Sequence, residues 1–279
     1  MHSNVLQFHI GETGLNSDGS LKSIPFTITQ PPAFSTFEQE RVHIKQQLAL
    51  AFRIFAKLGF EEGVAGHISI RDPEIKDSYW VNPFGKPFSR LRPSDLLWVS
   101  EKGEKLNTDA KGILGAGAFS LHASIHKHRA NANAVTHAHS MFGRTFSTLG
   151  VPLLPITQDA CAFYERHAIF SEFDGIPADT VIGHRIAETL GPLANGVIMQ
   201  NHGLLTVGET LQESIFWFVS MDRCCHSQML SMSTGLKPIA IAHDAASSAR
   251  DLVGNPTMGW FSAQPMFEKA AEENPDVFL

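Results

Sequence analysis

The sequence predicts one layered domain of the α/β or α+β class, and two observations support that prediction. Short apolar segments separated by turn residues lie between residues 66 and 99, which is typical of antiparallel strands joined by tight turns. From residue 118 onward, segments with helical periodicity alternate with further short strands. Strands that are first grouped and then interleaved with helices pack in layers around a shared core. The chain of 279 residues, 43% of them hydrophobic, is long enough to bury one.

The beginning of the chain divides into an arm and a helix. Residues 1–34 show little periodicity and many Gly, Ser, Asn and Pro residues, so we expect an irregular arm of the kind that can pack on a partner subunit. Ser35 and Glu38 have capping-box spacing and predict the start of the first helix. Apolar residues then recur at helical spacing up to Leu58, and Gly59 is a suitable C-terminal cap.

The remaining elements are predicted from the same periodicities, 3.6 residues for helices and 2 for strands. In chain order we expect strands over 66–71, 79–82 and 96–99, a helix over 118–129, a strand over 134–139, a helix over 140–148, an irregular stretch over 151–177, a helix from Asp179 to about Leu190, strands over 197–200 and 204–207, and an amphipathic helix from Glu209 to about Ser233. The domain is therefore predicted over residues 35–235, with 1–34 as an N-terminal arm and 236–279 as a C-terminal extension.

Composition and charge exclude several classes of function. The net charge is −6 and there is no block of Lys and Arg, so we expect no nucleic-acid partner and no binding to an anionic membrane. No apolar run is long enough to span a bilayer, and no secretory signal pattern is visible. The three cysteines are an odd number and two are adjacent, which favours free thiols in a reducing cytoplasm over a disulfide framework.

The pair His137 and His139 is the strongest chemical signal in the chain. Strand side chains alternate between faces with period two, so both imidazoles should leave one face of the predicted strand side by side, as two ligands of one metal ion would. A third histidine, His202, lies between Asn201 and Gly203 after another apolar run. Three neutral imidazoles with an open position suit a catalytic divalent metal, although residue type alone does not choose the metal. The alternative is three unrelated polar residues at strand ends.

Three further residues are candidates for proton transfer. Tyr164 and Glu165 lie in an irregular segment that is rich in groups that move protons or bind polar substrates. His122 stands four residues before His126 on one face of the predicted helix and could provide an acid, a base or a fourth ligand. For His126 and its neighbour His128 we expect a solvated helix end instead.

At four places the chain resembles the class II aldolase/adducin family. The segments similar to the family motifs AGNxSxR, TPTG, HxHS and NHG are, in that order, Ala65–Arg71, Asn82–Gly85, His137–Ser140 and Asn201–Gly203. The resemblance covers about Phe37 to Leu230 and implies a three-layer α/β/α fold around a central, mainly antiparallel sheet. It also implies a ring-shaped homotetramer with sites near subunit interfaces, and metal ligation by His137, His139 and His202.

The departures from the family pattern bear on the substrate. The catalytic carboxylate of the sugar-phosphate aldolases would fall at Ala118, and alanine cannot transfer a proton. The two serines that bind phosphate match Ala116 and Gly117, Phe84 replaces the second threonine of the TPTG turn, and His67 replaces the asparagine of the first motif. A bulky ring and lost hydroxyls argue for a more apolar substrate than a phosphorylated sugar.

Together these features predict a metal-dependent carbon–carbon lyase, of the aldolase or decarboxylase type, acting on a non-phosphorylated carbonyl or carboxylate compound. Zinc is the first choice of metal, with iron(II) or manganese as alternatives. Glu165, Tyr164 and His122 are the candidates for proton transfer. Two other readings stay open: an iron(II) oxygenase on the same three ligands, and an adducin-like module without enzyme activity. The presence of all three histidines speaks against the second.

Overall fold

The computed structural model describes residues 17–19, 28–173 and 180–279. Most of the predicted arm and the predicted helix cap at Asp179 lie outside these residues. The chain divides into two compact units, residues 1–33 and 34–279. In the first, the described residues 17–19 form a turn and residues 28–33 are neither helix nor strand. All helices and strands described below belong to the second unit.

A seven-stranded sheet is the centre of the second unit. In spatial order its strands are β3 (Leu97–Ser100), β2 (Ser78–Val81), β1 (His67–Arg71), β4 (Ala134–Ala138), β7 (Gly203–Gly208), β6 (Gly196–Met199) and β5 (His167–Phe170). Every neighbouring pair is antiparallel except β5 and β6, which are parallel. The predicted class, with a central and mainly antiparallel sheet, is confirmed.

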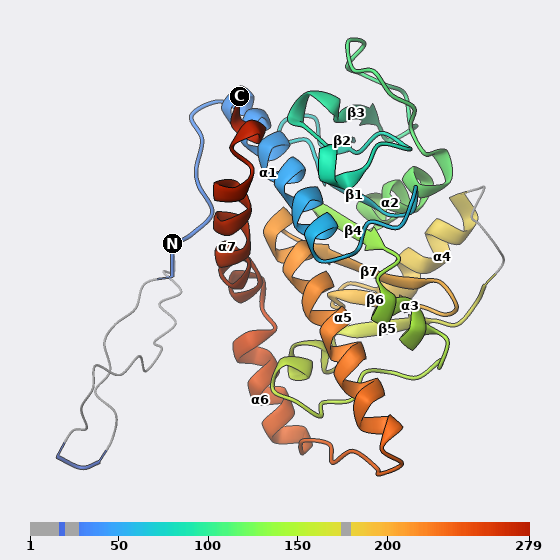
Figure 1. The fold of residues 1–279 in the computed structure, drawn as a ribbon, viewed down its shortest axis with the longest axis vertical. Coiled ribbons are helices and arrows are strands. Elements are labelled where there is room, and N and C mark those ends of the chain that lie inside the picture. The colour runs from blue at the N-terminus through green and yellow to red at the C-terminus, as the bar shows by residue number, and fades with distance from the viewer. Residues whose placement is uncertain (1–16, 20–27, 174–179) are drawn as a thin grey trace. The chain divides into compact units, whose positions relative to one another are not determined.

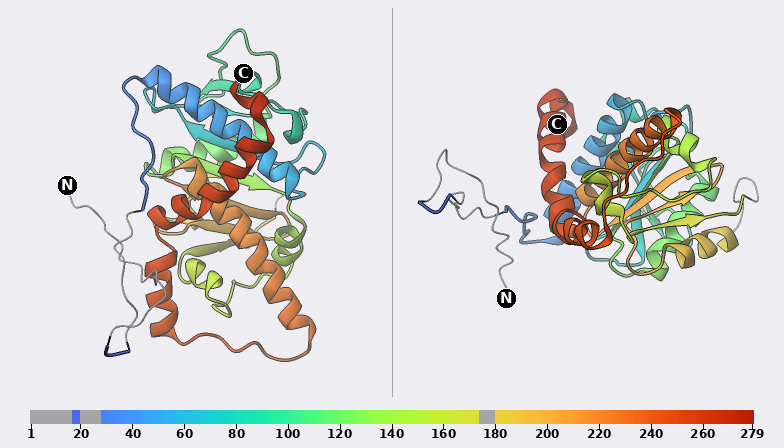
Figure 2. Two further views of the ribbon diagram at one scale, coloured as in Figure 1. Left: turned by 60° about the vertical axis from the view of Figure 1, so that its left-hand side comes forward. Right: turned by 90° about the horizontal axis from the view of Figure 1, so that it is seen from below.

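Helices cover both faces of this sheet, as Figures 1 and 2 show. One face is covered by α1 (Phe37–Lys57) and α5 (Leu211–Ser233), with α7 (Pro256–Glu273) packed on the outside of these two helices, and the other face by α2 (Ala116–His128) and α4 (Thr180–Leu190). The short α3 (Met141–Ser147) follows β4, and α6 (His243–Val253) precedes α7. The described residues of this unit also include four short 3₁₀ turns: η1 (Phe88–Arg90), η2 (Pro93–Asp95), η3 (Asp159–Phe163) and η4 (Pro275–Phe278). The three layers match the predicted α/β/α arrangement.

The first helix begins one residue later than the sequence pattern indicates. Its N-cap is Thr36, whose hydroxyl accepts a hydrogen bond from the backbone N–H of Gln39 at 3.2 Å. The side chain of Gln39 accepts in turn from the backbone N–H of Ser35. The predicted Ser35–Glu38 pair is therefore wrong by one position. Threonine caps a helix by the same chemistry as serine, so the residue types alone do not decide between the two neighbours.

The residues after 235 fold as part of the same unit. On α7, Trp260, Ala263 and Phe267 are buried against the α1–α5 layer. Lys57 at the end of α1 forms an ion pair with Glu273 at the end of α7. The predicted boundary at residue 235 thus falls in the loop between α5 and α6.

Alternation along β1 divides its side chains between two environments. Ile68 and Ile70 belong to the apolar cluster under α1 and α5. His67 and Ser69 reach the other face, where they meet α2. The period of two therefore places these polar side chains on the face of the sheet that α2 covers.

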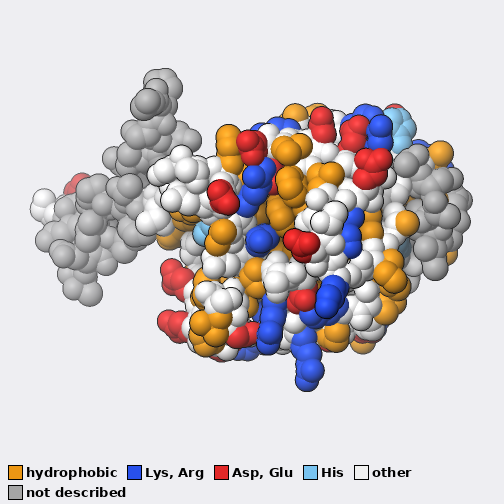
Figure 3. Space-filling model, turned by 90° about the horizontal axis from the view of Figure 1, so that it is seen from above, with side chains coloured by type: hydrophobic (Ala, Val, Ile, Leu, Met, Phe, Trp, Pro, Cys, Tyr) orange, Lys and Arg blue, Asp and Glu red, His pale blue; other side chains and the backbone are white. Residues whose placement is uncertain are grey.

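Three other observations complete the description. The three cysteines are free and buried, as small apolar residues usually are. Among the described helices, none has the length and apolar character needed to cross a bilayer. Figure 3 shows acidic, basic and hydrophobic side chains intermingled on the face seen from above.

Candidate metal centre

The three predicted ligands come together at one end of the central strands. His137 lies in β4, His139 follows that strand directly, and His202 lies in the tight turn between β6 and β7. The pairing of β4 with β7 sets Ala138 opposite Leu204, which brings the turn beside the end of β4. The third histidine therefore comes from the end of a strand that neighbours β4.

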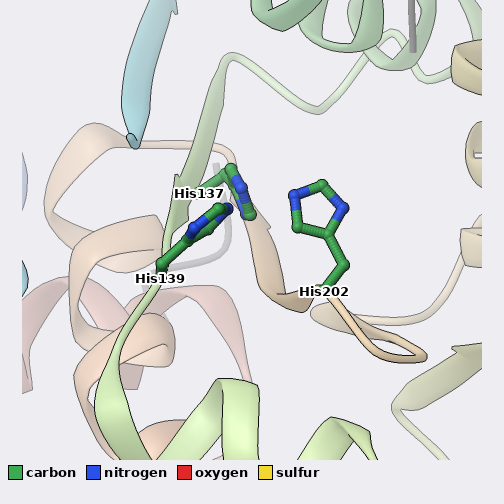
Figure 4. Close-up of side chains that lie close together, drawn as sticks. All are labelled: His137, His139 and His202. Carbon is green, nitrogen blue, oxygen red and sulfur yellow. The ribbon is translucent and has the colours of Figure 1, made fainter. Parts of the chain in front are cut away.

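The imidazole rings converge on a common point (Figure 4). One ring nitrogen of each of His137, His139 and His202 lies within 4.8 Å of the other two. The ring centroids are 5.1 Å apart for His137 and His139, 4.8 Å for His137 and His202, and 5.0 Å for His139 and His202. Three nitrogens at this spacing can share one divalent ion.

The turn that presents His202 needs unusual backbone angles on both sides. Asn201 has φ 58° and Gly203 has φ 154°. Asparagine tolerates the left-handed region better than most residues, and glycine adopts positive φ without steric cost. A Cβ added at Gly203 would also lie 3.4 Å from the carbonyl oxygen of Ala138. The Asn-His-Gly motif is therefore what lets the imidazole approach the end of β4.

Burial keeps the three imidazoles neutral, which is the form that binds a metal. It lowers the pKa of His137 well below its ordinary value, lowers that of His139, and lowers that of His202 to about 4. The Nδ1–H of His137 donates to the carbonyl oxygen of Leu204 at 2.7 Å, so its Nε2 carries the free lone pair. The donor set and its protonation state therefore fit a divalent metal.

A cavity of about 1100 Å³ opens over the three histidines. Its walls are mainly apolar and include Val81, Leu114, Phe119 and Leu121, with Val64, Phe84, Ile113 and Phe173 toward the exposed rim. Arg144 is the only lysine or arginine among the described residues that line it, and none of those residues is acidic. Such a cavity suits an apolar ligand with one anionic or carbonyl group.

A second group of polar residues lies in the wall of this cavity, between β1 and α2. His67 Nδ1 lies 2.6 Å from His122 Nε2, and His122 Nδ1 lies 2.7 Å from Ser69 Oγ. Ser69 Oγ lies 2.8 Å from His126 Nε2, and His126 Nδ1 lies 2.7 Å from the carbonyl oxygen of Ala132. His67 and His122 both line the cavity, and His122 is buried.

The prediction of a solvated position for His126 is wrong. Only 1% of this residue is exposed, and its ring stacks on Tyr79 of β2 at a centroid distance of 4.4 Å. Helical periodicity gives the reason, because His126 is four residues after His122 and shares the face that packs on β1. His128 is exposed at the helix end, as predicted.

Tyr164 and Glu165 lie elsewhere on this chain. The hydroxyl of Tyr164 lies 3.0 Å from Nδ1 of His243, and the carboxylate of Glu165 pairs with Arg250 at 2.7 Å. Both partners belong to α6, and neither predicted residue lines the cavity of its own chain. The proton-transfer role of these two residues stays a prediction.

Lowering the pH is expected to destabilise the metal-free protein, partly through His126. Burial, followed by the charge of Arg71, lowers the pKa of His126 from 6.5 to about 3. Below pH 6.5 the unfolded chain binds a proton that the native state excludes, so the unfolding free energy should fall by ~1.4 kcal/mol per pH unit for this residue. This loss continues until the pH approaches 3, where the native state also takes up the proton.

Urea unfolding of His126→Gln at pH values from 7 to about 4 tests this expectation. The pH dependence of stability should be shallower than in the wild type by about that slope. His128→Gln is the matched control, because solvent reaches His128 on the same helix. Equal slopes for the His126 variant and the wild type would contradict the assignment.

Comparisons with known proteins identify the family of this chain. Residues 46–229 match the family model for the class II aldolase and adducin N-terminal domain. The chain belongs to this family. The resemblance predicted from the four motifs is thereby confirmed, and the end of β4 and the turn before β7 hold two of those motifs.

Two curated relatives from Streptomyces are similar over most of the chain. One, "Decarboxylase NovR" from Streptomyces niveus, is 41% identical over 89% of this chain and 91% of its own length. Another, from Streptomyces roseochromogenus subsp. oscitans, is named 4-hydroxy-3-prenylphenylpyruvate oxygenase/4-hydroxy-3-prenylbenzoate synthase and is 40% identical over 88% of each chain. These names support an enzyme over a non-enzymatic module.

A solved structure has the same fold. The L-fuculose 1-phosphate aldolase from Glaciozyma antarctica PI12 superposes with a TM-score of 0.83 at 37% identity, covering 89% of this chain and 96% of that one. The family and the fold are therefore shown, and an enzyme of the lyase type is supported.

Proposed function

We propose that this protein is a metal-dependent carbon–carbon lyase of the aldolase or decarboxylase type, acting on a non-phosphorylated, apolar carbonyl or carboxylate compound. The observation that supports this proposal is the opening of the three-histidine cluster into an apolar-walled cavity whose described lining includes one arginine and no lysine. The relative named as a decarboxylase supports the reaction type. Zinc is the proposed metal, with iron(II) and manganese as alternatives.

The chain's own residues define what the cavity can do. The apolar walls would bind a ring or an alkyl chain and exclude water from the reacting bond. Arg144 would bind a carboxylate, and His137, His139 and His202 would hold the metal. When bound, the metal would supply a Lewis acid that stabilises negative charge on a substrate oxygen.

Proton handling requires a group other than residue 118, because alanine carries no exchangeable side-chain proton. Among the predicted candidates, His122 lies in the cavity wall. Its two ring nitrogens contact His67 and Ser69, so neither nitrogen is free to exchange a proton directly with a substrate.

An iron(II) oxygenase is the second candidate function. The relative whose name includes "oxygenase" favours it, and three histidine ligands leave positions for substrate and dioxygen. Its named substrate, a prenylated phenylpyruvate, also has the apolar and anionic parts that the cavity would accept.

One experiment separates the candidates. The purified protein is loaded with Zn²⁺, Mn²⁺ or Fe²⁺ and offered aromatic acids whose carbonyl lies at the α or the β position, while carbon dioxide, aldehyde and dissolved oxygen are followed. A lyase releases product without consuming oxygen, whereas an oxygenase consumes oxygen in proportion to product. Absence of turnover with every metal and acid would contradict both and favour the adducin-like module.

Replacing Arg144 with glutamine is expected to raise KM for a carboxylate substrate by about 10- to 100-fold, because a hydrogen bond to a charged group contributes ~1.5–3 kcal/mol. Arg144 also pairs with Glu62 at 3.1 Å, so Glu62→Gln serves as the control for loss of that ion pair. Steady-state kinetics of both variants give the answer. An unchanged KM in Arg144→Gln would contradict carboxylate binding at this position.

We further propose that the active form is a homotetramer, as the family resemblance implies. Four large apolar residues at the cavity rim are more than half exposed in the single chain: Val64, Phe84, Ile113 and Phe173. Exposed apolar surface of this kind is typical of protein interfaces. Light scattering should give roughly four chains per particle, in keeping with closed symmetry, and dilution to monomers should abolish turnover. A stable and fully active monomer would contradict this proposal.

A further inference from the structure

Between β1 and α2, the side chains of His67, His122, Ser69 and His126 form a row of hydrogen bonds. The last residue of this row determines which atom donates in each bond. The carbonyl oxygen of Ala132 can only accept, so Nδ1 of His126 must carry the hydrogen in their 2.7 Å contact. Burial keeps His126 neutral, with its pKa lowered to about 3, so its Nε2 has no hydrogen. Ser69 must therefore donate its hydroxyl hydrogen to His126.

The same reasoning continues from Ser69 to the cavity. A hydroxyl has one hydrogen, so Ser69 Oγ can only accept in its 2.7 Å contact with Nδ1 of His122. Burial also keeps His122 neutral, since its pKa lies well below the ordinary value. Its Nε2 is then an acceptor, and Nδ1 of His67 must donate to it across 2.6 Å.

From this geometry we propose that Ser69, His122 and His126 hold the neutral His67 ring in the tautomer that carries its hydrogen on Nδ1, so that its Nε2 is left toward the cavity as an acceptor for a hydroxyl of the substrate. His67 lines the cavity and is partly exposed to it. Its ring centroid lies 4.9 Å from that of His137, so a hydroxyl bound there would be next to the proposed metal. The ligand class is thus a compound with a hydroxyl near its metal-binding carbonyl.

Charge argues for a positioning role of the row rather than for transport of a proton along it. A proton passed from His67 would end on His126, beside Arg71, whose guanidinium donates to the backbone oxygen of His126 at 2.7 Å. That positive charge and the complete burial of His126 both oppose a second cation there. The hydrogen-bond row fixes a ring orientation, as neighbours of catalytic histidines commonly do.

Imidazole ¹⁵N–¹H correlation spectra of the metal-free protein, with labelled histidine, test the tautomer directly. At neutral pH, His67 should show a protonated Nδ1 and a bare Nε2, with His67→Gln used to assign its signals. In Ser69→Ala, His122 loses its acceptor and is free to invert, so both His122 and His67 should shift toward the opposite tautomer. Ser124→Ala is the matched control, because its hydroxyl donates to the backbone of the same helix and lies outside the row.

The wild-type spectrum decides the tautomer even if Ser69→Ala does not fold. A protonated Nε2 on His67 would overturn the proposal, and unchanged tautomers in a folded Ser69→Ala would overturn the role of Ser69.

The catalytic part rests on the proposed function: on a hydroxyl-bearing substrate, His67→Gln should lower turnover by about 100-fold or more while metal content stays that of the wild type. Loss of metal in this variant would instead assign His67 to metal binding. Lack of turnover in the wild type would count against the proposed function and leave the spectrum as the deciding result.

Discussion

Replacing His139 with alanine is expected to lower the affinity of the protein for its divalent metal by at least about 100-fold. Even the partners that orient metal ligands change affinity by about 10- to 100-fold, so loss of a ligand should cost more. His139 follows the end of β4 and is only partly buried, so the fold should tolerate the change. Metal analysis after dialysis should find stoichiometric metal in the wild type and little in the variant.

Thermal or urea unfolding gives an independent measure of the same loss. At a metal concentration 100 times the wild-type Kd, binding stabilises the native state by ~2.7 kcal/mol. A 100-fold weaker site gains only about 0.4 kcal/mol under the same condition. The exposed His184, which pairs with Glu188 on α4, provides the control His184→Ala. Full stoichiometric metal in His139→Ala would exclude His139 as a ligand.

The clustering of the three histidines was predictable because the spacing that produces it is local. Period two in a strand places His137 and His139 on one side whatever the rest of the chain does. The turn at His202 is equally local, since Asn201 and Gly203 both suit positive φ. The order of the strands is a long-range property that was not predicted, and the family resemblance supplied only the layers and the mainly antiparallel sheet.

The row behind His67 was missed, although its signal is present in the sequence. His67, Ser69 and Arg71 alternate along β1, and His122 and His126 share one face of α2. Each pattern alone is compatible with a solvated surface. Only the packing of α2 on β1 makes the two patterns face each other, and that packing is decided by the apolar residues around them.

The segment with Tyr164 and Glu165 has partners on a later helix. Its polar residues predicted groups for proton transfer, and on this chain both side chains contact α6. The helical structure of residues 243–253 was not predicted, so the sequence offered no competing partner for them. Polar side chains in a loop need hydrogen-bond or ion-pair partners, and here a later helix of the same chain provides those partners.

Sugar phosphates such as L-fuculose 1-phosphate are expected to be poor substrates, although a structural relative is named for that activity. A phosphate group needs several donors or cations. Residues 116 and 117 are alanine and glycine, residue 84 is phenylalanine, and the described cavity lining offers the single cation Arg144. Alanine at position 118 also removes the carboxylate that the family resemblance places there, which should cost about two to four orders of magnitude in rate.

The metal-loaded enzyme tests this expectation. Release of the phosphorylated fragment from the sugar phosphate is compared with release of product from non-phosphorylated aromatic acids. Ala118→Glu restores a carboxylate but no phosphate donor, so it should leave KM for the sugar phosphate high. Adding Ala116→Ser and Gly117→Ser should then lower that KM, because hydroxyls return at the start of α2. Wild-type turnover on a sugar phosphate at the rate of an ordinary enzyme, on the order of 10 per second, would show that neither the carboxylate nor the hydroxyls are needed. In that case Arg144, the backbone N–H groups near Gly117 and the metal would have to bind the phosphate without them, and the apolar walls would no longer indicate the substrate.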